Sequence, residues 1–217
     1  MSQPRERARS SIAGRVTILA MLLSATVAGC AGGGAELRYY LIDPAPVTVL
    51  AREAPLSIEV IDLDVPEYLE RFQIAARSSG NRVVYEANHQ WGEPLRKNLM
   101  RTLAVNLTRA LDSVVVATPL NRLASRPDVR VQVHVERFER DLDDRVHLHA
   151  RWQLLDRTGT PVATERVELV GAELRRGADP AMVVAAMQTL FGSFSERLAA
   201  SIVAVAPPSA AVDGEQG

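Results

Sequence analysis

Cys30 is the only cysteine in the 217 residues of this chain, and its position limits which part of the sequence can fold. It follows a run of thirteen apolar or small residues, Val16–Ala28, which is preceded by four arginines against the single acidic Glu6. A transmembrane helix needs about 20 apolar residues, so this run is too short to span a bilayer. A basic start followed by a short apolar stretch and small residues is typical of a secretory signal. We therefore expect residues 1–29 to be a removed signal peptide that takes no part in the fold.

The residues at the expected cleavage point, Val27-Ala28-Gly29-Cys30, look like a bacterial lipobox. In such a signal the cysteine sulfur is acylated, with fatty acids such as palmitate, and the cysteine becomes the first residue of the mature protein. The alternative is an ordinary secretory signal with a chance cysteine near its end. We favour lipidation of Cys30 because the sole cysteine directly follows the expected cleavage site of the signal peptide. With that sulfur acylated no disulfide can form, so the domain must be stabilised by packing.

Processing would leave 188 residues, which suits one domain of ordinary size. We expect residues 30–36 to be the lipidated cysteine and a short flexible spacer, residues 37–205 the folded domain, and residues 206–217 a disordered tail. The mature chain carries 21 basic and 25 acidic residues, a net charge of −4. This mildly acidic balance argues against nucleic acid as a partner and against polybasic binding to anionic lipid.

Hydrophobic periodicity predicts two principal helices. The first, at about residues 92–112, has leucines at strict four-residue spacing that would form one buried face, and Pro94 suits its first turn. The second, at about residues 179–205, begins at Asp179-Pro180, an N-cap residue followed by proline. Gly192 inside the second helix should weaken it by about 1 kcal/mol relative to alanine.

Alternation of apolar and polar residues predicts the strands. Val129–Phe138 is a long one, and a change of phase near Phe138 predicts a β-bulge. The last three strands should form a meander with one face on the core and the other in water. Together with the helices they predict a single α/β domain with a mixed, mostly antiparallel sheet. The predicted strands are residues 37–42, 56–63, 82–87, 114–117, 129–138, 146–154 and 162–174.

The sequence contains none of the short motifs that mark common enzymes: no G-x-S-x-G, S-x-x-K, P-loop, H-E-x-x-H or G-x-G-x-x-G. This weakens the case for an enzyme without closing it, because catalytic groups need not be adjacent in sequence. His147 and His149, with His134, could approach one metal ion, but the alternation places the first two on the polar face of their strand. The acidic residues of 136–144 could hold calcium loosely, although a solvated hairpin tip is the commoner structure. We therefore expect no metal and no cofactor.

Several stretches, in this order, resemble the PqiC-type family of ABC-type transport auxiliary lipoproteins. They are Val65–Arg71, Gln73-Ile74, Trp91–Leu95 and Leu103–Leu107, with Tyr39-Tyr40-Leu41 and Glu136-Arg137-Phe138. The resemblance covers roughly residues 30–205, and its specificity comes from the order and spacing of these stretches. This chain departs from the family at Phe72, often proline, and at Gly92, often alanine. Both departures concern loop geometry.

The resemblance implies a mixed α/β domain on the periplasmic face of the outer membrane. It implies an MCE-domain protein that crosses the periplasm as partner, an ABC permease and ATPase as more distant partners, and in some members a homo-oligomeric ring. Ala31 after the lipidated cysteine is not the aspartate that usually signals retention in the inner membrane. This also favours the outer membrane.

These observations support a non-enzymatic accessory subunit of an MCE/ABC-type intermembrane phospholipid transport system that maintains outer-membrane integrity. The alternatives are a lipoprotein chaperone for outer-membrane assembly or lipopolysaccharide export and, less favoured, a periplasmic hydrolase. We hypothesise that Tyr68, Leu69, Trp91 and Pro94 contribute to a partner or assembly surface. The competing interpretation, given equal weight, is that Tyr68 and Trp91 pack within the core or a turn.

Overall fold

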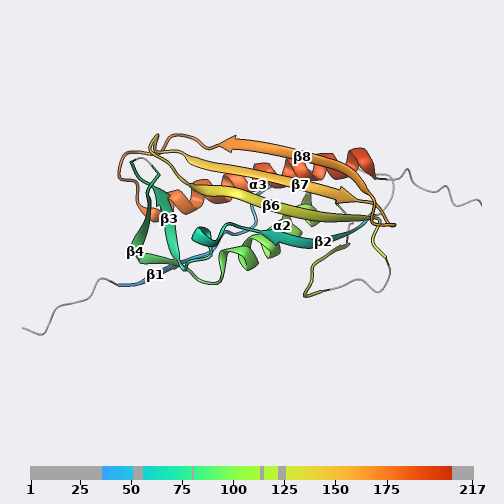
Figure 1. Cartoon of the computed structure of the whole chain (residues 1–217), viewed down its shortest axis with the longest axis horizontal. Helices are drawn as coiled ribbons and strands as arrows, with labels where there is room; N and C mark the ends of the chain where they lie inside the picture. Colours follow the sequence, from blue (N-terminus) through green and yellow to red (C-terminus); the bar gives the residue numbers. More distant parts are fainter. Residues whose placement is uncertain (1–35, 51–55, 80, 113–114, 122–125, 207–217) are drawn as a thin grey trace, which may run out of the picture. The chain divides into compact units, whose positions relative to one another are not determined.

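The computed structural model describes residues 36–50, 56–79, 81–112, 115–121 and 126–206, and those from Leu37 onward belong to one compact unit. Eight strands form a single mixed sheet, and two helices pack with it (Figure 1). The mixed sheet and the two helices are as the sequence predicted, but only seven of the strands were predicted. The elements in chain order are β1 (Arg38–Tyr40), β2 (Ser57–Asp64), η2 (Glu67–Leu69), β3 (Gln73–Arg77), β4 (Val83–Trp91), α2 (Leu95–Ala110), β5 (Val115–Ala117), β6 (Val129–Arg140), β7 (Val146–Leu155), β8 (Pro161–Val170) and α3 (Pro180–Val205).

Helix α2 buries the predicted leucine face. Each fully buried leucine contributes about 1.5–3 kcal/mol in transfer terms, so this face is a main source of stability. The helix begins at Leu95 because Pro94 has an extended backbone, with ψ of 126°, and is the N-cap rather than part of the first turn. The prediction of a helix from about residue 92 was therefore too early by three residues. The buried leucines are Leu95, Leu99, Leu103, Leu107 and Leu111.

Helix α3 begins as predicted, because the Asp179 carboxylate accepts a hydrogen bond of 2.8 Å from the Ala181 amide and Pro180 follows the cap. Its buried side packs on the sheet through aromatic rings. The Phe191 and Phe194 centroids are 5.5 Å apart, and Phe194 meets Trp152 of β7 edge to face at 5.7 Å. Such aromatic pairs stabilise a core beyond their buried area, so they fix α3 against β7.

Strand β6 is the centre of the sheet. One edge pairs with β7 along its length, and the other edge is shared by β2 over Val129–His134 and by β3 at Arg140. β6, β7 and β8 form the predicted antiparallel meander, while β2 runs parallel to both β5 and β6. The register between β6 and β7 shifts between Val135 and Arg137, so the bulge exists but lies closer to Glu136 than to Phe138. β8 ends at Val170 rather than near residue 174.

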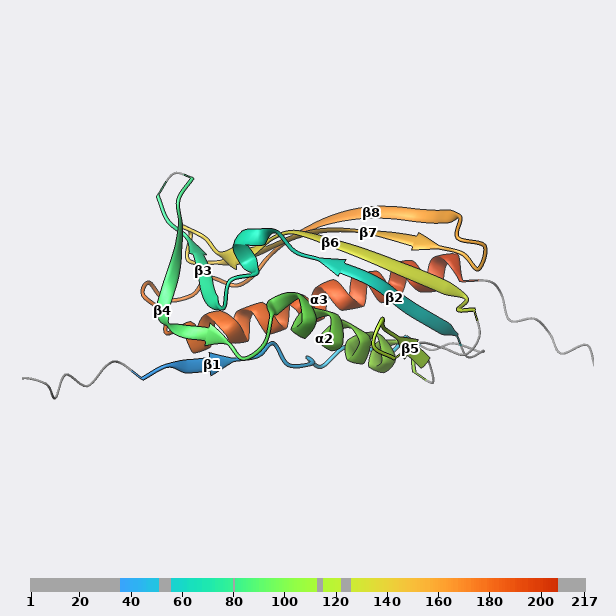
Figure 2. The same cartoon turned by 60° about the horizontal axis from the view of Figure 1, so that its bottom comes forward.

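The sheet bends at β3 and β4, so that β1 lies on the opposite side of α3 from the meander (Figure 2). β1 pairs in parallel with the last three residues of β4, His89–Trp91, which is why β4 extends beyond the predicted end at residue 87. The pairing holds only Arg38–Tyr40, so β1 is shorter than predicted. β3 was not predicted as a strand, because Ile74, Ala75 and Ala76 are all buried and give no alternation.

Residues 41–50, which we call the N-terminal strap, follow β1 and lie against both helices. The Ile42 amide donates to Asn98 Oδ1 at 2.7 Å, and its carbonyl accepts from Thr102 Oγ1 at 2.6 Å. Further along, the Thr48 amide donates to Glu196 Oε1 of α3 at 2.6 Å. The strap therefore has no regular structure of its own, yet the backbone groups of Ile42 and Thr48 are bonded by side chains of α2 and α3.

Asp128 joins the starts of β2 and β6 to the β7–β8 turn. Its carboxylate accepts hydrogen bonds from the Ser57 amide at 2.8 Å, the Ser57 hydroxyl at 2.6 Å and Arg157 Nε at 2.9 Å. Partial burial alone would raise the pKa of Asp128, but the hydrogen bonds from Ser57 and Arg157 together outweigh it and lower that pKa below 3.8. Because the folded pKa is the lower one, the stabilisation is present above about pH 4 and is lost as the pH falls below it.

We expect Asp128→Asn to lower the free energy of unfolding by about 1 kcal/mol at pH 7 and to have a smaller effect at pH 3. Urea denaturation at the two pH values measures both. Asp43→Asn, at an exposed position of the strap, is the control and should change neither. An equal loss at pH 3 and pH 7 would show that the ionised carboxylate of Asp128 does not contribute.

Candidate functional site

The four predicted surface residues occupy different environments. Leu69 and Trp91 are each only 3% exposed and belong to the hydrophobic core. Tyr68 is partly buried, and Pro94 is exposed. Only Pro94 and part of Tyr68 can therefore touch another molecule. Leu69 and Trp91 can affect a partner only through their packing in the core.

The Tyr68 hydroxyl donates a hydrogen bond of 2.6 Å to Glu139, a carboxylate with no exposed surface. The other Glu139 oxygen accepts from Arg77 Nε at 3.0 Å and from Arg137 Nε at 2.7 Å. Burial, and then the neighbouring Glu139 carboxylate, raises the pKa of Tyr68 far above its ordinary value, so the hydroxyl remains a donor. We call Glu139 and its three partners the Glu139 cluster.

The Glu139 cluster corrects one expectation from the sequence. Glu139 was placed with the acidic residues of a solvated hairpin tip, but it is fully buried where β3 meets the end of β6. The bulge before Arg137 turns Phe138 towards the core, so Glu139 lies on the other face of β6, opposite His147. Glu139 is buried there by Tyr68, Arg77 and Arg137, which bond to its carboxylate. The backbone pairing of β3 with β6 is confined to Ala76 and Arg140. The cluster therefore links β3 and η2 to the central strand through side chains.

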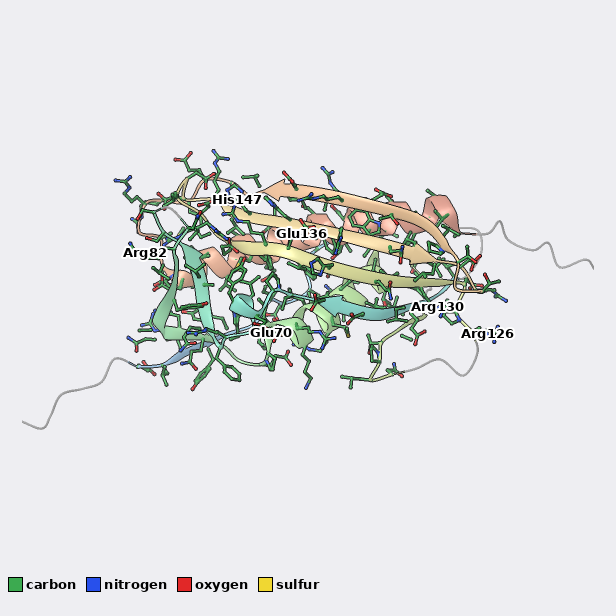
Figure 3. All side chains as sticks on the ribbon, in the orientation of Figure 1. Glu70, Arg82, Arg126, Arg130, Glu136 and His147 are labelled. Atoms are coloured by element: carbon green, nitrogen blue, oxygen red, sulfur yellow. The ribbon has the colours of Figure 1, made fainter. Side chains whose placement is uncertain are left out.

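His147 and His149 lie on the polar face of β7, as the alternation predicted (Figure 3). His147 Nε2 is 3.0 Å from an Asp143 carboxylate oxygen, and its ring centroid is 6.2 Å from that of His149. Partial burial lowers the pKa of His149, which therefore favours its neutral form. Within the part of the chain that the structure describes, no three His, Cys, Asp or Glu side chains are grouped so as to hold a metal ion.

The same polar face contains a shallow hollow of about 380 Å³. Its one close pair of titratable groups is His134 and Asp64, whose Nδ1 and Oδ2 atoms are 2.8 Å apart. Neither His147 nor His149 lines it, and it has no serine or cysteine that His134 could activate. The arrangement suits polar contact with another molecule. The lining residues are Asp62, Asp64, Gln132, Val133, His134, Arg151, Trp152, Gln153 and Thr164.

In the described residues, neither α2 nor α3 is both long and apolar enough to cross a membrane. Sequence comparison then decides the family, because residues 39–199 match the model of the ABC-type transport auxiliary lipoprotein component. The chain belongs to this family. The resemblance seen in the sequence is thereby confirmed.

Among members of the auxiliary lipoprotein family, this chain is similar to the intermembrane transport lipoprotein PqiC of Escherichia coli K12. The two are 30% identical over 176 residues, which cover 79% of this chain and 88% of PqiC. The PqiC protein of Shigella flexneri gives the same values.

Two solved structures share the fold of this auxiliary lipoprotein. One, the crystal structure of an uncharacterized protein, has a TM-score of 0.63 and 24% identity, and the match covers 77% of this chain and 99% of that one. The other, from Xanthomonas campestris, has a TM-score of 0.62 and 17% identity, with 75% and 92% covered. At these identities the likeness establishes the fold alone.

Sequence reasoning missed the polar side chains that attach the N-terminal strap. Asn98 and Thr102 are buried on α2, among the leucines of its apolar face. Polar residues within an otherwise apolar helical stripe are a readable signal, since a buried polar group needs a hydrogen-bond partner. The sequence could therefore indicate that Asn98 and Thr102 have partners, but not that Ile42 is the partner.

Proposed function

We propose that this chain is a non-enzymatic accessory subunit of an MCE/ABC-type system that moves phospholipid between the two membranes of the cell envelope. In this proposal Cys30 is lipidated and holds the domain on the periplasmic face of the outer membrane, where the system maintains membrane integrity. The observation that carries the proposal is the 30% identity to PqiC, named an intermembrane transport lipoprotein, over 88% of that protein.

The N-terminal strap supports a role in which the domain works while tethered. Residues 31–36 reach at most about 20 Å when fully extended, so an acylated Cys30 would keep the domain close to the bilayer. Beyond β1 the strap is bonded to Asn98 and Thr102 of α2 and to Glu196 of α3. A force applied at the anchor would therefore be transmitted through the strap to both α2 and α3, and would not simply extend an unattached N-terminal segment.

The proposed partners are an MCE-domain protein that spans the periplasm and, through it, an ABC permease and ATPase. We further propose that copies of the chain assemble into a homo-oligomeric ring, with Tyr68 and Pro94 at a contact surface that Leu69 and Trp91 support from within. Pro94→Arg should leave the fold intact because the proline is exposed. We expect it to reduce recovery of the MCE protein or of other copies in purification from membranes. Unchanged recovery of both would exclude Pro94 from these contacts.

The test of the proposed function is Cys30→Ala. We expect this variant to move from the membrane to the soluble periplasmic fraction and to lose transport-dependent resistance to membrane stress. Gly33→Ala, which keeps the cysteine and the spacer length, is the matched control and should behave like the parent protein. Full function from the soluble variant would show that tethering is no part of the mechanism.

A second measurement separates the proposal from the alternative of an assembly chaperone. The intact lipoprotein would be purified from membranes and its complexes identified by mass. An MCE protein among them supports lipid transport. Barrel-assembly or lipopolysaccharide-export proteins in its place would favour the chaperone.

A further inference from the structure

β1 and its flanking residues present three apolar side chains to the outside of the fold. Leu37, Tyr39 and Leu41 are 47%, 63% and 40% exposed. Successive strand residues point to opposite faces, so these three share one face. Tyr40 lies on the inner face, where its ring stacks on His89 with centroids 5.6 Å apart. We call Leu37, Tyr39 and Leu41 the β1 strip.

The sheet register separates the β1 strip from the exposed Phe72. Gln73 of β3 pairs with Gln90 of β4, which pairs with Tyr39, so Phe72 before Gln73 lies on the other face from Tyr39. Single exposed apolar residues such as Phe72 are normal, whereas three on one face of a single segment, as in the β1 strip, indicate an interaction surface.

Helix α2, which is bonded to the strap directly after β1, exposes a basic face. Its sixteen residues include no acidic side chain. Arg96 lies on the β2 side of the helix, where it pairs with Asp62 and donates to the Leu63 carbonyl. Arg101 pairs with Glu93, while Lys97 forms no ion pair within the described ranges. The basic face consists of the exposed Lys97, Arg101 and Arg109, and it differs from the net acidic balance of the whole chain.

We propose that the β1 strip, with the basic face of α2 beside it, rests on the surface of an anionic phospholipid bilayer. The inference rests on the proposed anchoring through Cys30. Leu37 is seven residues after Cys30, so a fully extended chain allows at most about 25 Å between them. Leucine and aromatic side chains are favoured at the bilayer interface, and basic residues are attracted to anionic headgroups.

Two features make this surface suitable for a bilayer. The strip is held in place, because Asn98 and Thr102 fix the backbone of Ile42 directly after it. It also lies across α3 from the meander, whose polar face contains the shallow hollow (Figure 2). Contact of the β1 strip with the bilayer would therefore turn the polar face towards the periplasm, where a protein partner could reach it.

The test uses the intact lipoprotein with Tyr39→Cys. Acylation occupies the sulfur of Cys30, so the introduced thiol is the one that takes an environment-sensitive fluorophore. The matched control is Leu142→Cys, at a position that is 61% exposed in the β6–β7 turn. Each labelled protein is reconstituted in vesicles of phosphatidylethanolamine and phosphatidylglycerol that contain a headgroup-quenching lipid. We expect several-fold stronger quenching at position 39 than at position 142, and weaker quenching at position 39 without phosphatidylglycerol.

Equal, weak quenching at both positions on vesicle-bound protein would overturn this inference and leave the anchor intact. Absent quenching together with crosslinks between two copies through position 39 would also overturn it, in favour of a second copy as occupant. Labelling of the parent protein, or failure to float with vesicles, would instead contradict the anchoring through Cys30, and the inference with it. Unchanged circular dichroism establishes that both variants fold.

Discussion

Replacement of Glu139 by alanine is expected to lower the free energy of unfolding by about 3 kcal/mol, because removing one partner of a buried ion pair leaves the other charge uncompensated. The Glu139 side chain has no exposed surface, while the side chains of its partners Arg77 and Arg137 are 28% and 18% exposed. Water can therefore solvate these arginines in part, which places the effect at the low end for a broken buried pair. Urea denaturation with fluorescence detection measures it.

Two further variants separate the contributions within the Glu139 cluster. Tyr68→Phe removes one hydrogen bond and should cost about 1–2 kcal/mol, less than the loss of Glu139. Glu168→Ala, which removes an exposed carboxylate 3.6 Å from Arg166, is the control and should stay within about 0.5 kcal/mol of the parent. If Glu139→Ala resembled this control, β3 and η2 would not depend on the cluster for attachment.

Gly192→Ala is expected to destabilise the domain, although helix propensity alone predicts a gain of about 1 kcal/mol. A Cβ built on Gly192 would lie 2.7 Å from the Cβ of Ala45 in the N-terminal strap. The strap would have to move away from α3, and overpacking of this kind typically costs about 1–3 kcal/mol. We expect a net loss of about 1–2 kcal/mol in thermal or chemical denaturation, together with faster proteolysis of the strap.

The matched test removes the other methyl group. Ala45→Gly leaves room for a Cβ at position 192, so adding it to Gly192→Ala should restore most of the lost stability. The coupling energy between the two substitutions measures the contact directly. A stability gain from Gly192→Ala alone would show that the strap yields without cost. In that case the glycine would only weaken the helix, as its position in the sequence suggested.

Local patterns predicted the elements whose burial is regular. The leucines of α2, the Asp179-Pro180 start of α3 and the alternation of β6 and β7 each reflect a repeating environment that neighbouring residues share. The polar placement of His147 and His149 followed from the same alternation. The family followed from the order of several short stretches. Each of these inferences needs only information spread along one segment of the chain.

Other features depended on contacts between distant segments. β3 is buried on both faces and lacks alternation, and β4 extends to Trp91 because its end pairs with β1 and, at Gln90, with β3. Tyr68 and Trp91, candidates for a partner surface, owe much of their burial to Glu139 and the core. Glu139 is buried because Tyr68, Arg77 and Arg137 contact its carboxylate, whereas its place among acidic residues in the sequence indicated solvent.

The sequence by itself determined the two helices, the meander and the family, because these depend on residue order and local periodicity. It also predicts a signal and a lipid anchor at Cys30, which lies outside the described residues. The tertiary structure alone decided that Ala45 lies against Gly192, that Asn98 and Thr102 hold Ile42, and which apolar residues remain exposed around β1. Burial is a property of the assembled fold. Residues far apart in the chain determine the burial of a side chain together, and no local sequence pattern shows which of them will be in contact.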